Sequence, residues 1–369
     1  MPDNDRKMWA EYFYWYWLMS CRSTASMSNT YGVCGNDNSG FPECATEKES
    51  VMKKFAWSGA VCAALLAVSV ISAKAADIVI GVPNWPSVAA TANILKVVME
   101  DNFGVEVELQ NATNPVVFEA MDTGSMHVHP EVWLPNQANL HNSFVKDKGT
   151  VKMSPNGVEA FQGMCVTKGT AERTGIKNLA DLTDPEMSKH FDTNGDGKGE
   201  VWIGASGWAS TNVEKIRAKS YGYDETMELI EMDETLALAG VDAAVAKKSN
   251  LVFFCYTPHH LFALHELVIL KEPSFDAAKW KVIQPTDDPQ WLEKSEAPVA
   301  WDLAYLHVHY AASLDKSFPE VASMLSNVKL NTELVSGMTY ALVVDKVDPA
   351  EYAKKWVEEN AKLVDSWMK

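Results

Sequence analysis

The chain has 369 residues, of which 47% are hydrophobic and 22% charged, and its 49 acidic and 32 basic side chains give a formal net charge of -17. This composition is typical of a globular protein of about two domains, and it excludes a disordered, collagen-like or small disulfide-rich chain. We expect no nucleic-acid partner and no anionic membrane surface as partner, because both are bound through clustered Lys and Arg.

The first 75 residues differ from the rest because they carry seven acidic and seven basic side chains. Within them, Met52-Lys53-Lys54 is a basic start, residues 55–72 are mainly apolar, and Ala73-Lys74-Ala75 is a small-x-small cleavage site. We predict a signal peptide over residues 52–75, export to the periplasm, and residues 1–51 as an upstream translation artefact. A membrane anchor is the alternative, which the shortness of the apolar run disfavours.

Strand and helix patterns alternate from residue 77 onward. Strands are predicted over 77–82, 105–109, 126–133, 201–205, 227–232 and 251–256, and helices over 87–103, 115–121, 210–221, 235–248, 319–328, 332–343 and 349–368. This alternation predicts an α/β fold in which helices cover mostly parallel sheets, in two halves of similar size. Since no Gly/Ser-rich linker separates the halves, we expect backbone crossings to join them.

Two cysteines, Cys165 and Cys255, follow the predicted signal peptide, both in apolar strand-like runs. An oxidising periplasm would allow them to form a disulfide. Two buried free thiols remain an equal alternative, because the sequence does not report the distance between them.

Three tryptophans lie where predicted strands end: Trp85, Trp133 and Trp208. Open α/β sheets bind ligands at this edge, and the repetition in both halves argues against core packing, which is the ordinary role of a Trp. Aromatic faces attract cations, and alkylammonium groups are desolvated cheaply. Only Arg173 and Arg217 follow residue 75, so a guanidinium clamp for an anionic ligand is not expected.

Glu131 lies two residues from Trp133 and would share its side of a strand. We predict that its carboxylate faces the cationic end of a ligand. A solvated loop carboxylate is the alternative interpretation.

A second candidate site precedes residue 201. Oxygen-bearing side chains at alternate positions, with Gly197 at the sharp turn, are typical of calcium loops. The predicted calcium ligands are Asp192, Asn194, Asp196, Glu200 and the carbonyl of Lys198. A full EF-hand is excluded because Ile203 stands where the bidentate Glu belongs, and a plain Asn-Gly/Asp-Gly turn is the alternative.

Four segments carry a family resemblance: Gly81-Val-Pro-Asn-Trp85, Trp133-Leu-Pro-Asn136, the run from Asp192 to Trp208, and Tyr256-Thr-Pro-His-His260. Together they resemble the glycine betaine/proline betaine substrate-binding proteins of ABC importers, most closely their trimethylamine N-oxide-binding member, over nearly all of residues 77–369. The resemblance implies a two-lobed α/β periplasmic binding protein of type II, a Venus flytrap with its ligand in the cleft. We assign lobe I to residues 76–162 plus 254–369 and lobe II to residues 163–253.

The resemblance also implies ligand-contacting residues. Trp85 and Trp208 match aromatic-box positions of the betaine binders, whereas His260 stands where the family often has Trp, so Trp133 and Trp301 are the predicted substitutes. Because Glu131 would repel a ligand carboxylate, trimethylamine N-oxide is expected before glycine betaine, with choline also compatible. The expected partners are this small methylated amine or N-oxide and an ABC permease of the inner membrane, bound by a monomer.

A zinc protein or an enzyme is the competing class. Its signal is three histidine pairs: His127 with His129, His259 with His260, and His307 with His309. A His-x-His pair on a strand shares one face, which zinc tolerates. No zinc-protease, serine-hydrolase or Cys-x-x-Cys motif accompanies these pairs, so we expect a binding protein without catalytic activity.

Overall fold

The computed structural model describes residues 76–369, so the predicted signal peptide and residues 1–51 lie outside the described part. The strands are β1 (Ile78–Val82), β2 (Val107–Asn111), β3 (Val128–Leu134), β4 (Val151–Met153), β5 (Val158–Thr167), β6 (Gly199–Gly204), β7 (Met227–Glu231), β8 (Val252–Thr257), β9 (Leu267–Ile269) and β10 (Ala304–Ala311). The longer helices are α2 (Pro86–Phe103), α3 (Asn114–Thr123), α7 (Ala209–Tyr221), α8 (Glu234–Lys247), α12 (Pro319–Asn327), α13 (Thr332–Val343) and α14 (Pro349–Glu359). The shorter helices are α4 (Ala138–His141), α5 (Lys168–Thr174), α6 (Pro185–Ser188), α9 (Leu261–Leu264), α10 (Trp291–Lys294), α11 (Leu314–Ser317) and α15 (Ala361–Trp367). None of these helices is both long and apolar enough to cross a bilayer.

The first sheet region has the strand order β2-β1-β3-β10. β1 is parallel to β2 and β3, as the βαβαβ pattern predicts, and its side chains are almost all buried because helices cover the sheet. α2 begins with Pro86, whose fixed φ suits the first helical turn, and ends at Gly104 with φ 63°. The loop between β1 and α2 is therefore short, and it carries Trp85.

The second sheet region repeats this arrangement with the order β5-β8-β6-β7. β6 is parallel to β7 and β8, and α7 follows β6 as α2 follows β1. Trp208 is the residue before α7, the position that Trp85 occupies before α2. The two halves thus place a Trp at equivalent points.

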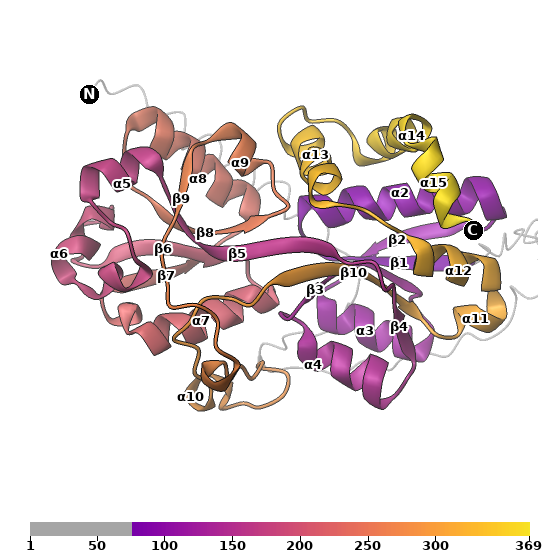
Figure 1. The fold of residues 1–369 in the computed structure, drawn as a ribbon, viewed down its shortest axis with the longest axis horizontal. Helices are drawn as coiled ribbons and strands as arrows, with labels where there is room; N and C mark the ends of the chain where they lie inside the picture. The colour runs from indigo at the N-terminus through magenta and orange to yellow at the C-terminus, as the bar shows by residue number, and fades with distance from the viewer. Residues whose placement is uncertain (1–75) are drawn as a thin grey trace, which may run out of the picture. The chain divides into compact units, whose positions relative to one another are not determined.

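β5 joins the two sheet regions. Its residues 158–160 pair with β10 and its residues 161–166 pair with β8, so one continuous strand passes from one region to the other (Figure 1). Both β5 and β10 run antiparallel to their neighbours. The prediction of mostly parallel sheets is therefore wrong in this central part, where the sheet is mixed, and β10 was not predicted as an element.

The predicted lobe boundary at residue 254 stays a prediction, but the contacts favour a later crossing. β8 pairs with β6, and the Arg217 guanidinium on α7 contacts Glu272 and donates to the carbonyl of Val299. Lys219 on α7 donates to the carbonyl of Leu292 at 2.6 Å. These contacts attach residues up to about 300 to α7, and we propose that the chain returns to the first region just before β10.

The C-terminal helices cover the first region, where α13 and α14 pack against α2. The helix predicted over 349–368 is interrupted at Asn360, whose side chain donates to the carbonyl of Trp356 at 2.8 Å. The two resulting helices, α14 and α15, bury Trp356 and Trp367, whose rings stack with centroids 6.2 Å apart.

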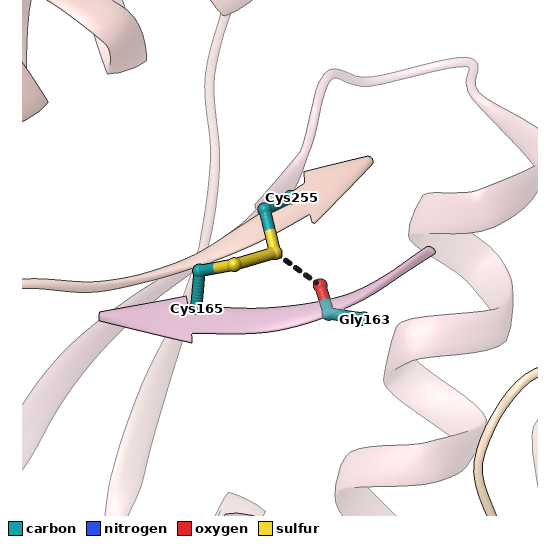
Figure 2. Close-up of a disulfide and its surroundings, with 3 residues drawn as sticks. All are labelled: Gly163, Cys165 and Cys255. Carbon is teal, nitrogen blue, oxygen red and sulfur yellow. Dashed lines mark hydrogen bonds between the residues drawn. A yellow bond between two sulfur atoms is a disulfide. The ribbon is translucent and has the colours of Figure 1, made fainter. Parts of the chain in front are cut away.

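Cys165 on β5 and Cys255 on β8 form a disulfide, with Cα atoms 5.8 Å apart (Figure 2). This settles the open question of their pairing. The Sγ of Cys255 also lies 3.4 Å from the carbonyl oxygen of Gly163, but a disulfide sulfur carries no proton to donate. The bond links neighbouring strands 90 residues apart in sequence.

Candidate functional site

A pocket with an empty volume of about 380 Å³ lies between the ends of the two sheet regions. Its lining consists of aromatic and neutral polar residues: Trp85, Asn114, Trp133, Asn136, Gln137, Gln162, Trp208, Ala209, Ser210, Phe254 and Tyr256. These residues come from both regions and from β5, which joins them. Among the described residues that line this pocket there is no Lys, Arg, Asp or Glu.

Three predicted tryptophans, Trp85, Trp133 and Trp208, come together in this pocket. The rings of Trp85 and Trp208 meet edge to face, with centroids 6.4 Å apart and planes at 90°. Trp133 lies within β3, near its end, as the strand predicted over 126–133 places it. Each ring is less than a tenth exposed, so all three indoles are buried at the pocket.

Tyr256 on β8 supplies the wall that the sequence left open. Its ring meets Trp133 at 5.3 Å and Trp208 at 6.0 Å, with interplanar angles of 88° and 81°. Edge-to-face contacts of this kind fix ring orientation. Sequence reasoning missed Tyr256 as a site residue. The signal that could have found it is strand alternation, because Phe254 and Tyr256 are two residues apart on β8 and so share one face.

Two glycines allow Trp208 to reach the box. Gly207 has φ 86° and Gly204 has φ 125°, conformations that residues with a side chain rarely adopt. A Cβ atom at Gly204 would lie 2.3 Å from Thr211 Oγ1 and 3.3 Å from Cε3 of Trp208. The close approach of β6 to the Trp208 indole therefore requires glycine at position 204.

Glu131 lies behind the box and not in its wall. Its Oε1 accepts hydrogen bonds from Trp85 Nε1 at 3.0 Å, Trp133 Nε1 at 3.2 Å and Ser87 Oγ at 2.7 Å. Glu131 is therefore not among the residues that line the pocket, and its contact with a ligand stays a prediction. Its carboxylate instead orients two of the box indoles from the rear.

The environment of Glu131 opposes its ionisation. Burial raises the pKa of this carboxyl to about 7, although the three donors on Oε1 act in the other direction. The Oε2 atom is buried and has no hydrogen-bond partner among the described residues. The negative charge behind the box therefore develops only near neutral pH.

Neutral amides line a part of the pocket, where Gln162 on β5 contacts Asn136 in the turn after β3. Asn136 Nδ2 donates to Gln162 Oε1 at 2.6 Å, and Gln162 Nε2 donates to Asn136 Oδ1 at 2.9 Å. Asn114 Oδ1 lies 2.9 Å from His129 Nε2. Amide groups can donate a hydrogen bond to a ligand oxygen without adding positive charge that would repel a ligand cation.

Trp301 is not among the residues that line the pocket, so the structure does not bring it together with the other three tryptophans. Its indole donates to Glu214 Oε1 at 2.6 Å, and its ring packs against Trp280 at 5.3 Å. Glu214 and Arg217 are completely buried on α7, with Arg217 Nε 3.1 Å from Glu214 Oε1. Trp301 therefore belongs to a buried ion-pair cluster that attaches the segment before β10 to α7.

His260 is also outside the pocket lining. Its ring stacks on His259 with centroids 4.3 Å apart. Burial lowers the pKa of His260 to about 3, and the neighbouring His259 adds to this effect. Tyr256, and not His260, therefore supplies this wall of the box.

The histidines of the other two predicted pairs have local partners. His127 Nδ1 accepts from the Val79 amide at 2.9 Å, and His141 Nδ1 lies 3.1 Å from His309 Nε2. Burial lowers the pKa of His309 well below its ordinary value. No group of three or more His, Cys, Asp or Glu side chains within residues 76–369 is arranged to hold a metal ion.

Four of the predicted calcium ligands, Asp192, Asn194, Asp196 and Lys198, lie in the turn before β6, and the fifth, Glu200, is the second residue of β6. The two carboxylate oxygens of Asp192 accept from the amides of Gly195 at 2.6 Å and Gly197 at 2.9 Å. Glu200 Oε2 accepts from the Thr193 amide at 2.8 Å. Internal hydrogen bonds account for this turn, so its geometry does not require an ion, and calcium stays a prediction.

The loop after β1 contacts the second region directly. Trp208 Nε1 donates to the carbonyl of Asn84 at 3.1 Å, and Asn84 Nδ2 donates to Asp233 Oδ2 at 3.3 Å. Gln284 Nε2 lies 3.4 Å from the carbonyls of both Asn136 and Ala209. These contacts hold the box between two groups of elements.

Comparisons with known proteins agree with this arrangement. The profile of the OpuAC family, described as the substrate binding domain of ABC-type glycine betaine transport systems, matches residues 76–359. The trimethylamine N-oxide-binding protein of Pelagibacter ubique is 23% identical over 308 residues, which cover 80% of this chain and 94% of that protein. The glycine betaine-binding periplasmic protein OusX of Dickeya dadantii is 29% identical over 127 residues, 34% of this chain and only 38% of that protein's length.

A solved structure of the glycine betaine/L-proline-binding protein ProX from Borrelia burgdorferi has the same fold, with a TM-score of 0.63 at 17% identity. The superposition covers 79% of this chain and 96% of that one. The predicted α/β fold of a two-lobed binding protein is thereby confirmed. With the family profile spanning most of the described residues, the chain belongs to the family of substrate-binding domains of ABC-type glycine betaine transport systems.

Proposed function

We propose that this protein binds trimethylamine N-oxide in the box formed by Trp85, Trp133, Trp208 and Tyr256 and delivers it to an ABC permease of the inner membrane. The observation that carries the proposal is the box itself: four aromatic side chains meet at centroid distances of 5.3 to 6.4 Å around a pocket that no described charged side chain lines. Binding of the ligand without chemical conversion is part of the proposal.

The ring faces suit a trimethylammonium group. Its positive charge is attracted by the quadrupole of each ring, and its three methyl groups bury apolar surface against the same rings. The carboxyl of Glu131, hydrogen-bonded to two of the indoles, adds negative potential from behind once it is ionised. The site therefore favours the cationic end of a methylated amine.

The polar end of the ligand decides between candidate compounds. An N-oxide oxygen can accept hydrogen bonds from the amides of Asn136 or Gln162, which line the pocket. A ligand carboxylate would find no Lys or Arg in the described lining and would be repelled by Glu131. These features favour trimethylamine N-oxide over glycine betaine.

Glycine betaine and choline are the alternative ligands. The matching family profile supports glycine betaine. Choline is supported because the described lining has no Lys or Arg to bind an anionic group. Delivery by a monomer in the periplasm is part of the proposal. The interactions of Asn84 with Trp208 and Asp233 would then form when the two lobes close on the ligand.

The test is a parallel calorimetric titration of the protein with trimethylamine N-oxide, glycine betaine and choline. We expect the N-oxide to bind most tightly. Replacing Trp208 with Ala should weaken that binding about 30-fold or more, because a desolvated cation–π contact contributes about 2 kcal/mol. Trp291→Ala is the matched control, since Trp291 on α10 is outside the pocket lining. Equal affinity of Trp208→Ala and wild type for the N-oxide would refute the assignment of the ligand to the aromatic box.

A further inference from the structure

We propose that Glu234, on α8, is a positioning and specificity residue of this site. Its carboxyl group holds Tyr256 in the box and adds a second acidic group behind the aromatic rings. This second acidic group selects cationic ligands that lack a carboxylate. The inference rests on the proposed function and deepens it, because it concerns the substrate class. It identifies a residue that does not line the pocket and acts through one that does.

Glu234 is the first residue of α8 and is only 4% exposed. Its Oε1 accepts the hydrogen bond of the Tyr256 hydroxyl. An acidic residue in the first turn of a helix is common, but it normally faces solvent. Here the α8 N-terminus directs the carboxylate inward, onto the polar end of a ring that forms a wall of the box.

His259 contributes to the same arrangement. Its Nδ1 accepts from the Leu261 amide at 3.1 Å, so the neutral imidazole carries its proton on Nε2. That nitrogen lies 3.2 Å from Glu234 Oε1 and is therefore the donor. Tyr256 and His259, whose rings meet at 4.8 Å, thus share one acceptor oxygen.

Glu234 and Glu131 have the same relation to the box. Glu131 accepts from the indoles of Trp85 and Trp133, and Glu234 accepts from the Tyr256 hydroxyl. In each carboxyl group one oxygen takes all these hydrogen bonds, and the Oε2 atom is buried without a hydrogen-bond partner in the described part of the chain. In both groups, therefore, no described donor offsets the partial negative charge of Oε2.

The two carboxyl groups also influence each other and the ring between them. The charge of Glu234 adds to burial in raising the pKa of Glu131. Burial first, and then the charge of Glu234, raise the pKa of Tyr256 well above its ordinary value, so its hydroxyl remains a donor. A trimethylammonium ion in the box would offset this negative charge, whereas a zwitterion with a carboxylate would bring a third negative group.

The experiment compares choline, trimethylamine N-oxide and glycine betaine by calorimetry in wild type, Glu234→Gln, Tyr256→Phe and the double variant. Glu228→Gln is the matched control, because it makes the same charge change at an exposed position on β7. Melting curves establish that each variant is folded. We expect Glu234→Gln to weaken choline binding about tenfold, as for loss of a charged hydrogen-bond partner, and to weaken glycine betaine binding less than about threefold.

Two further results are expected. The double variant should lose less affinity than the product of the two single losses, because Glu234 acts partly through Tyr256. Glu228→Gln should match wild type. If Glu234→Gln weakened the binding of all three ligands equally, the role of Glu234 would be purely structural and the inference would be overturned. Unchanged affinities for all three ligands would also overturn it.

If Glu234→Gln does not fold, Tyr256→Phe carries the test, since it keeps the ring and removes the hydroxyl that Glu234 holds. Weaker binding supports the positioning role, and wild-type affinity overturns it. Failure of wild type to bind any of the three compounds would instead refute the proposed function, so the two failures are distinguishable.

Discussion

Removing the disulfide should lower stability while leaving the site largely intact. Cys165 and Cys255 are separated by 90 residues, and the chain-entropy relation for a loop of this length gives about 4.6 kcal/mol of stabilisation at 25 °C. For the roughly 294 described residues this corresponds to a fall in Tm of about 7 °C. Replacing both cysteines with Ala avoids placing a hydroxyl in their buried positions.

Ligand affinity should change by less than about threefold in this variant. β5 and β8 keep their register through continuous pairing from Phe161 opposite Thr257 to Val166 opposite Val252, which positions Gln162, Phe254 and Tyr256 without the covalent bond.

The assay is urea unfolding, followed by fluorescence, of the oxidised wild type and the double Ala variant, each with and without a reducing agent. The reductant should destabilise the wild type and leave the variant unchanged. Equal free energies of unfolding for oxidised wild type and variant, with the bond verified by thiol titration, would refute the loop-entropy reasoning.

Three other predictions concern single features. The pKa of Glu131 is raised from 4.5 to about 7, so the folded state keeps a proton that the unfolded chain releases. The free energy of unfolding should therefore fall by about 3 kcal/mol between pH 4.5 and 7. Glu131→Gln should remove this pH dependence in urea titrations. An equally steep slope in that variant would contradict the assignment. If the Asp192 turn binds calcium, a chelator should lower the Tm of the wild type but not of Asp192→Asn; identical melting curves with and without chelator would identify a plain turn. Gly204→Ala should cost about 1–3 kcal/mol in unfolding experiments and weaken ligand binding, because its Cβ would displace Thr211 or Trp208; wild-type stability would show that β6 adjusts freely.

Local patterns predicted much of the regular structure. The strand over 77–82, the helix ending at Gly104, and the helices beginning at Pro319, Thr332 and Pro349 appear with small shifts at their ends. Hydrophobic periodicity, Pro at helix starts and Gly at helix ends are properties of neighbouring residues, so they can be read without tertiary information. β10 and the break at Asn360 were missed, because pairing and packing with distant segments decide them.

Site residues could be predicted where their type and their position after a strand were enough to identify them. They could not be predicted where their role depends on contacts with residues from distant segments of the chain. Trp85 and Trp208 could be identified from the sequence because each follows a strand and precedes a helix. Tyr256 and Glu234 could not, since their meeting depends on the packing of α8 against β8. The surroundings of Trp301 could not be predicted for the same reason, because it contacts Glu214 and Arg217 on α7, far away in the sequence.

The sequence by itself determined the α/β class, the family resemblance and the aromatic character of the site, because these depend on residue types and their local order. Only the tertiary structure decided that Glu131 lies behind the box, that Cys165 and Cys255 are bonded, and that Tyr256 encloses the pocket. Each of these facts is a contact between segments far apart in the chain, and such contacts are fixed by how the sheets and helices pack together.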